Sequence, residues 1–206
     1  MVGDLTLGVL ALQGAFAKHE EMLQAMGIKC LKVVDAEALL SCDGLILPGG
    51  ESTTMNLQIH RLNLLQLLKE RAQVIPFFGT CAGMILMAQK GALNLLDIEI
   101  SRNAYGNQSA SFSTELEFFS GKTAQALFIR APRIISIHST HVKVLAQYEG
   151  EAVCVQQKHH LACAFHPELT NNFLIHQYFV HLCINKKKQS LQQPSKITPT
   201  RSSLTI

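Results

Sequence analysis

The first part of the chain alternates strand-like and helix-like segments, and this alternation constrains the fold most. Residues 5–12 form a nearly continuous apolar run, typical of a strand covered on both faces of a parallel sheet. Residues 15–26 have helical periodicity, with apolar side chains on one side and charged ones on the other. Further strand-like segments follow at residues 28–34, 44–47 and 74–78. This order predicts an α/β fold with a parallel or mostly parallel sheet and right-handed crossovers.

The pattern changes after about residue 92, where short strand-like segments replace the alternation. These segments are residues 95–100, 111–119, 126–129, 134–137, 142–147, 152–156 and 161–165. They predict an antiparallel extension or a mixed edge on the central sheet. Two helices are also expected: one that Ser52 or Thr53 caps and that runs to about Arg71, and a closing one over residues 169–185. We predict a single domain over residues 1–185.

Composition and charge exclude several classes of protein. With 206 residues, 48% hydrophobic and 16% charged, the chain has enough apolar material for one folded domain. The net charge is +3, but residues 186–206 hold five basic residues and no acid, so residues 1–185 carry −2. Nucleic-acid binding is therefore not expected. Residues 186–206 are polar and contain two prolines, which predicts a disordered tail.

Membrane attachment and secretion are not expected either. No apolar run reaches the roughly 18 residues that cross a bilayer, and the first residues lack the basic region of a signal peptide. The six cysteines show no CxxC and no framework spacing, so reduced thiols are expected. We therefore expect a cytoplasmic protein.

A zinc site is the alternative interpretation of one cysteine- and histidine-rich stretch. The potential ligands are Cys154, His159, His160, Cys163 and His166. Their spacing fits no familiar zinc site, and the segment alternates like a pair of strands. No metal is therefore predicted.

Residues 78–83, FGTCAG, have the context of a nucleophile elbow, a sharp turn between a strand and a helix. Gly79 and Gly83 allow a tight turn and close packing around Cys81. The N-terminus of the following helix favours a thiolate at Cys81, and the backbone N–H of Ala82 can face a developing oxyanion. A core cysteine in an ordinary turn is the alternative interpretation.

Residues 165–169, FHPEL, bring a base and a carboxylate close together. His166 and Glu168 are two residues apart, so on a strand their side chains leave from the same face. Glu168 is then able to hold one ring nitrogen of His166 while the other faces Cys81. A nucleophile, a base and a group that orients the base are the requirements of covalent acyl transfer. The alternative is a solvent-facing pair in a loop.

Residues 47–55, LPGGESTTM, follow a strand at the sheet edge where ligand sites of open α/β folds gather. The glycine pair lets backbone N–H groups approach a substrate closely, and the N–H of Gly50 is the expected second oxyanion donor. A phosphate-binding loop was the alternative. The Walker pattern G-x-x-x-x-G-K-[ST] is absent, so nucleotide binding is not expected.

Because of these segments, the chain resembles the class I, triad-type glutamine amidotransferases. It is most similar to the family of glutaminase subunits of pyridoxal 5′-phosphate synthase. The further segments that carry this resemblance are LALQG at residues 10–14, LPGGESTTM at 47–55, RNAYG at 102–106 and FIRAP at 128–132. The resemblance covers about residues 5–185. It implies a class I amidotransferase-like, flavodoxin-like sheet flanked by helices.

The resemblance also implies roles for individual residues. Cys81 is the nucleophile, His166 the general base and acid, and Glu168 its orienting group. Gln13 lies near a partner-facing side. The residues expected around glutamine are Gly50, Glu51, Ser52, Arg102, Ile129 and Arg130.

The implied reaction is hydrolysis of L-glutamine to glutamate and ammonia through a thioester on Cys81. No metal or organic cofactor is needed. The ammonia passes to a separate (β/α)₈-barrel synthase subunit, whose docking completes the oxyanion loop of a subunit that is largely inactive alone. The chain departs from the family pattern in two places: a shorter segment around residues 89–94, and Ala104 and Tyr105 in the RNAYG motif.

Two other functions remain as alternatives. One is a scaffold of the same complex that has lost turnover. The other keeps the triad with a different acyl substrate, as in another amidotransferase subunit or a γ-glutamyl hydrolase.

Overall fold

A seven-stranded sheet forms the centre of the computed structural model, which describes residues 4–102, 111–118 and 121–192. The strand order is β2-β1-β3-β4-β11-β10-β9. The five parallel strands are β1 (Thr6–Leu10), β2 (Lys29–Val33), β3 (Gly44–Leu47), β4 (Phe77–Thr80) and β11 (His160–Cys163). The antiparallel strands β10 (Glu151–Gln157) and β9 (Val142–Tyr148) complete one edge. The predicted mostly parallel, mixed α/β sheet is confirmed.

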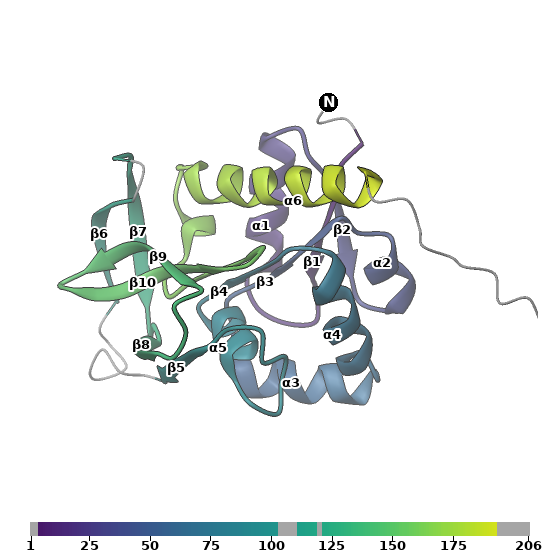
Figure 1. Ribbon diagram of the computed structural model, residues 1–206, viewed down its shortest axis with the longest axis horizontal. Coiled ribbons are helices and arrows are strands. Elements are labelled where there is room, and N and C mark those ends of the chain that lie inside the picture. Colours follow the sequence, from purple (N-terminus) through teal and green to yellow (C-terminus); the bar gives the residue numbers. More distant parts are fainter. Residues whose placement is uncertain (1–3, 103–110, 119–120, 193–206) are drawn as a thin grey trace, which may run out of the picture.

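Helices cover both faces of this sheet (Figure 1). Their bounds are α1 (Phe16–Ala25), α2 (Ala36–Leu40), α3 (Ser52–Arg61), α4 (Leu65–Val74), α5 (Ala82–Ala88) and α6 (Leu174–Gln192). Helices α1 and α6 lie on one face, whereas α3 and α5 lie on the other. Strands β3 and β4 are buried at every residue, because helices exclude water from both sides.

The single helix expected from Ser52 or Thr53 to Arg71 is wrong in two respects. It is divided into α3 and α4 near Asn63, which has a left-handed backbone with φ of 55°. Asparagine tolerates this conformation better than most residues, so it ends one helix before the next begins. The cap of α3 is Glu51, whose carboxylate accepts hydrogen bonds from the backbone N–H groups of Thr53 and Thr54.

The strands after residue 92 do not all extend the central sheet. β5 (Ile98–Ser101) pairs with β8 (Arg133–Ile137), and β6 (Ser111–Glu117) pairs with β7 (Thr123–Ile129), in two separate antiparallel sheets. The expected extension is therefore correct for β9, β10 and β11, which form a mixed edge of the central sheet, and wrong for the other four strands. A bridge between Phe118 and Ala146 and the ring contacts of Phe112 with Tyr148 and of Phe128 with Phe165 help hold the β6–β7 pair against the domain.

The end of α6 differs from the sequence-based expectation. The helix continues past Asn185 to Gln192, where a disordered tail is expected. Lys187 fixes this extension, because its Nζ donates to Asp43 Oδ2 at 2.8 Å and to the Asp4 carbonyl at 2.7 Å. Residues 193–206 lie outside the described residues, as do residues 103–106 of the RNAYG motif. Among the described helices, none is long and apolar enough to cross a membrane.

Candidate active site

The candidate site lies where β1, β3, β4 and β11 end, at the carboxyl edge of the parallel strands. A cavity of about 520 Å³ opens there. The sequence-predicted residues that line it are Gly50, Glu51, Ser52, Cys81, Ala82, Arg102, Ile129, Arg130 and His166. Glu168 lies behind His166, at 3% exposure. The fold thus gathers five separate segments around one cavity of a size typical for small ligands.

Cys81 lies in a strained elbow between β4 and α5. Its φ of 48° and ψ of −104° place a non-glycine residue in a rarely populated backbone region. The backbone N–H of Cys81 donates to the Cys163 carbonyl at 2.9 Å, which continues the β4–β11 pairing into the turn. A Cβ on Gly83 would lie 2.0 Å from the Leu47 carbonyl oxygen, so only glycine allows α5 to approach β3 this closely. The result is a nucleophile projected from a rigid turn.

His166 and Glu168 are adjacent in space, but not for the reason expected. β11 ends at Cys163, and both residues belong to a turn that leads into the 3₁₀ helix η1 (Pro167–Leu169). The strand alternation predicted for them is therefore wrong. The backbone N–H of His166 donates to the Leu127 carbonyl at 2.8 Å, which ties this turn to β7. The His166 Nδ1 and Glu168 Oε1 atoms are 2.7 Å apart.

The electrostatics of the site favour a charged His166–Glu168 pair. Burial disfavours a charged His166, but hydrogen bonds to Cys81 and Glu168 outweigh it and raise the pKa of His166 to about 10. Burial likewise opposes charge on Glu168, but His19 and His166 lower the pKa of this carboxyl. At neutral pH the site therefore holds a carboxylate and a protonated imidazole next to the Cys81 sulfur.

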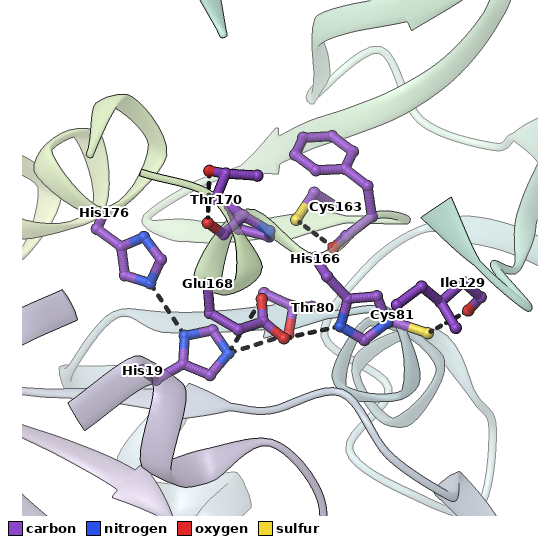
Figure 2. Close-up of polar contacts among 11 residues, drawn as sticks. His19, Thr80, Cys81, Ile129, Cys163, His166, Glu168, Thr170 and His176 are labelled. Atoms are coloured by element: carbon purple, nitrogen blue, oxygen red, sulfur yellow. Dashed lines mark hydrogen bonds and ion pairs between the residues drawn. The ribbon is translucent and has the colours of Figure 1, made fainter. Parts of the chain in front are cut away.

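Two residues at the end of β7 line the same cavity as the nucleophile. The Cys81 Sγ lies 3.9 Å from the Ile129 carbonyl oxygen, as Figure 2 shows. The next residue, Arg130, has a φ of 45° and an exposed side chain. Such a backbone is uncommon for a non-glycine residue, and strain of this kind tends to be retained at functional sites.

The glycine loop after β3 covers the other side of the cavity. The Gly49 carbonyl accepts a hydrogen bond from the backbone N–H of Ala15 at 2.9 Å, and Gly50 has a φ of 155°. The backbone N–H of Glu51 donates to Gln13 Oε1 at 3.1 Å. A Cβ on Gly49 would lie 2.3 Å from the His166 ring, so a glycine is required for this close approach.

The Glu51 carboxylate caps the N-terminus of its own helix, α3. Its carboxylate accepts from the Thr54 N–H and hydroxyl, both at 2.7 Å, and from the Thr53 N–H at 3.0 Å. These bonds, led by the one from the Thr54 hydroxyl, lower the pKa of Glu51 to about 2. Glu51 therefore shapes the start of α3, and it also lines the cavity.

Arg102 reaches the cavity from the end of β5. Its guanidinium donates to Gln89 Oε1 at 2.5 Å and to Thr53 Oγ1 at 3.4 Å. The short segment around residues 89–94 thus places Gln89 against Arg102 at the cavity rim. A larger hollow of about 700 Å³ lies beyond Arg102 and contains no triad residue.

One buried residue next to the triad was missed in the sequence. His19 of α1 lies on the far side of Glu168, with its Nε2 3.5 Å from Glu168 Oε2. The available signal was its position, because His19 lies three residues after Phe16 and four before Leu23, on the apolar face of the helix. A fully buried histidine on such a face requires a polar partner.

The five residues considered as zinc ligands have other surroundings. Cys154 and Cys163 are cross-strand neighbours in β10 and β11, and His160 Nδ1 accepts from the Phe77 N–H at 3.2 Å. In the described part of the chain, no group of three or more potential ligands could hold a metal ion.

Comparisons with known proteins agree with this geometry. Residues 9–185 match the SNO glutamine amidotransferase family. The pyridoxal 5′-phosphate synthase subunit PdxT of Desulforamulus reducens is 46% identical over 187 residues, which cover 86% of this chain and 99% of that protein. The subunit of the same name from Carboxydothermus hydrogenoformans is 41% identical over 185 residues, covering 85% and 96%. A solved structure described as a glutamine amidotransferase has a TM-score of 0.81 and 36% identity, and the match covers 86% of this chain and 98% of that one.

Proposed function

The chain belongs to the SNO glutamine amidotransferase family, and on this premise we propose that it hydrolyses L-glutamine and supplies the ammonia for pyridoxal 5′-phosphate synthesis. The observation that carries this proposal is the Cys81–His166–Glu168 arrangement at the wall of one cavity. The names of the relatives, each a pyridoxal 5′-phosphate synthase subunit, support the destination of the ammonia.

The first half-reaction uses Cys81 as the nucleophile. Its thiolate attacks the side-chain amide carbon of glutamine and forms a tetrahedral oxyanion. When this intermediate collapses, the C–N bond breaks, and protonated His166 donates its Nε2 proton to the departing ammonia. The raised pKa of His166 supports this role, because the ring is already protonated before the reaction.

The second half-reaction releases glutamate. His166 is now neutral and takes a proton from a water molecule, which attacks the γ-glutamyl thioester. The C–S bond breaks, and the proton on His166 balances the regenerated thiolate. Glu168 keeps Nδ1 of His166 protonated throughout, through the 2.7 Å contact.

The backbone N–H groups of Gly50 and Ala82 are the proposed oxyanion donors. Each donor of this kind lowers the barrier by roughly 3 kcal/mol. The Gly49–Gly50 peptide is held by the bond from the Ala15 N–H to the Gly49 carbonyl. We propose that docking of a synthase subunit breaks this bond and turns the peptide so that the Gly50 N–H faces the oxyanion.

The remaining cavity residues orient the substrate. Arg102 and Arg130 supply positive charge at the rim, complementary to the α-carboxylate of glutamine. Ser52, Glu51 and the Ile129 carbonyl offer polar groups for the α-amino end.

The proposed partner is a (β/α)₈-barrel pyridoxal 5′-phosphate synthase subunit, approached through the loop that contains Gln13. A cytoplasmic location is proposed with it. The support is chemical: the nucleophile must stay reduced, and all six cysteines are free thiols.

The test is ammonia release from glutamine, measured with and without a synthase barrel subunit. We expect rapid release only in the complex, and none from the complex with Cys81→Ala. Release that persists in Cys81→Ala would exclude the mechanism. A wild-type complex that binds but releases nothing would favour the scaffold, which the intact triad geometry argues against.

A further inference from the structure

A buried pair of histidines lies directly behind the triad. His19 of α1 and His176 of α6 are both fully buried, with His19 Nδ1 3.0 Å from His176 Nε2. His19 Nε2 lies 3.2 Å from Thr80 Oγ1 and 3.5 Å from Glu168 Oε2. Figure 2 shows His19 between His176 and Glu168, on the side of the carboxylate opposite His166. The proposed mechanism gives neither histidine a role.

The hydrogen atoms of this pair can be assigned by counting. Burial lowers the pKa of both rings, that of His176 to about 3, so each is neutral and carries one N–H. In the described part of the chain, His176 Nδ1 has no hydrogen-bond partner. If His19 Nδ1 donated to His176 Nε2, His176 would carry its hydrogen on Nδ1, as a buried N–H without an acceptor. Such a group is costly, whereas an unpaired lone pair is less so.

With the opposite assignment, each N–H of the two rings has an acceptor nearby. His176 Nε2–H donates to His19 Nδ1, so the His19 hydrogen lies on Nε2. That nitrogen lies 3.2 Å from Thr80 Oγ1 and 3.5 Å from Glu168 Oε2, so both oxygens are within reach of its hydrogen. Among the residues that the structure describes, Glu168 Oε2 is otherwise a buried carboxylate oxygen without a hydrogen-bond partner. His19 Nε2, 3.5 Å away, supplies a donor that suits the negative charge of this oxygen.

We propose that His19 is a positioning residue, which holds the Glu168 carboxylate from behind by its Nε2–H while His166 holds it from the front. This inference rests on the proposed glutaminase function and adds a residue to it. Glu168 orients His166 only if its own carboxylate cannot rotate. His19 fixes it, and His176 fixes the tautomer of His19.

The position of His19 supports a role beyond packing. Its ring joins Thr80, the residue before the nucleophile, to the 3₁₀ turn of Glu168 and to α6. The titratable groups that face Glu168 in the described structure are His166 on its own turn, His19 of α1 with His176 behind it, and Cys163 of β11. Of these, only His166 and His19 place a nitrogen next to the carboxylate oxygens.

Two matched amide variants test the proposal. In His19→Gln the side-chain amide reaches the position of Nε2 and still donates to Glu168. In His19→Asn the amide reaches only the position of Nδ1, near His176. In the complex with a synthase barrel subunit, we expect His19→Asn to lower kcat for ammonia release about tenfold to a hundredfold, with KM nearly unchanged. His19→Gln should retain most of the wild-type kcat.

The pH profile separates positioning from stability. The His19 N–H stabilises the charged form of Glu168, so its loss makes the carboxyl protonate at higher pH. In a plot of kcat against pH, the fall of kcat on the acidic side, here called the acid limb, should therefore move to higher pH in His19→Asn. It should stay in place in His19→Gln. The matched control is His160→Asn, which alters a buried histidine outside the site; it should lower the melting temperature without moving the limb.

The outcomes distinguish this inference from the proposed function. If the wild-type complex releases ammonia and His19→Asn and His19→Gln have the same kcat and acid limb, the positioning role is overturned while the glutaminase function stands. If the wild-type complex releases none, the function itself fails. Nitrogen NMR of the wild-type chain decides independently of folding of the variants: a hydrogen on His19 Nε2 supports the proposal, and one on Nδ1 overturns it.

Discussion

The two sides of the cavity are built differently. On one side Cys81, His166 and Glu168 are at most 7% exposed and held by backbone and side-chain hydrogen bonds. On the other side Gly50 and Arg130 are exposed and have positive φ angles. The reactive groups are thus fixed before a substrate arrives, whereas the substrate-facing groups are the ones free to be rearranged. The fixed groups and the exposed groups thus belong to different segments of one site.

The largest effect is expected on the buried side. Cys81→Ala should lower ammonia release by the complex at least ~10³-fold, because no second cysteine is among the described residues that line the cavity. Stability should change little, since a small side chain is truncated. Steady-state ammonia assays together with thermal melts check this. A residual rate above one per cent of wild type would contradict the role of Cys81.

Glu168→Gln should have the next largest effect. The amide keeps the shape of the carboxylate but no longer stabilises the protonated His166, so we expect kcat to fall about 10²-fold. KM should change much less, because Glu168 lies behind the cavity wall. If the variant instead raised KM and left kcat unchanged, Glu168 would act on substrate binding. The division into reactive and substrate-facing residues would then be wrong.

The buried side was also the more predictable side. The elbow at Cys81 and the pairing of His166 with Glu168 follow from short motifs, because their chemistry restricts the residue types. The reason given for the pairing was wrong, since a 3₁₀ turn and not a strand aligns the two side chains. His19 was missed because its partner Glu168 comes from a distant segment. Such a contact depends on how α1 packs, which local periodicity does not specify.

The outer elements show where sequence patterns stop being sufficient. The strand-like segments were found, but their division into β5–β8 and β6–β7 was not. Short alternating runs give the same signal whichever strand they pair with, because pairing depends on long-range register. The cap at Glu51 was also missed, since Ser52 and Thr53 are equally good caps by residue type.

Gly50→Ala tests the substrate-facing wall. A Cβ there would lie 2.5 Å from Gln13 Oε1, on a backbone with φ of 155°. We expect about a tenfold or greater loss of kcat in the complex, because the oxyanion loop can no longer turn. Gly150→Ala is the matched control, since Gly150 also has a positive φ of 81° but nothing within 4 Å of the added Cβ. It should cost about 1 kcal/mol of stability and leave kcat unchanged. Equal kcat losses in the two variants would argue against a specific role of the loop.

Stability should depend on pH through His166. Its pKa in the folded chain is about 10, above the unfolded value of about 6.5. Its contribution is therefore complete below pH ~6.5 and is lost as the pH rises toward 10. We expect the free energy of unfolding to fall by about 1 kcal/mol or more over this range, as measured by urea denaturation. Cys81→Ala, which removes one cause of the raised pKa, should reduce this fall. An identical pH dependence in both chains would contradict the coupling.

Arg102→Lys should have the smallest effect. The cation is kept, but its bonds to Gln89 and Thr53 are weakened. We expect KM for glutamine to rise a few-fold with kcat unchanged, because the side chain is exposed and contacts only the rim. Initial-rate kinetics in the complex provide the measurement. A loss confined to kcat would assign Arg102 to the reactive wall.

The central claim is that Cys81 is the nucleophile that attacks bound glutamine. The most direct measurement treats the complex with a glutamine-like diazoketone and locates the label by peptide mass spectrometry. The account predicts one label, on Cys81 alone among the six cysteines, and protection by excess glutamine. A label on another cysteine, or labelling of Cys81 that glutamine does not prevent, would contradict it.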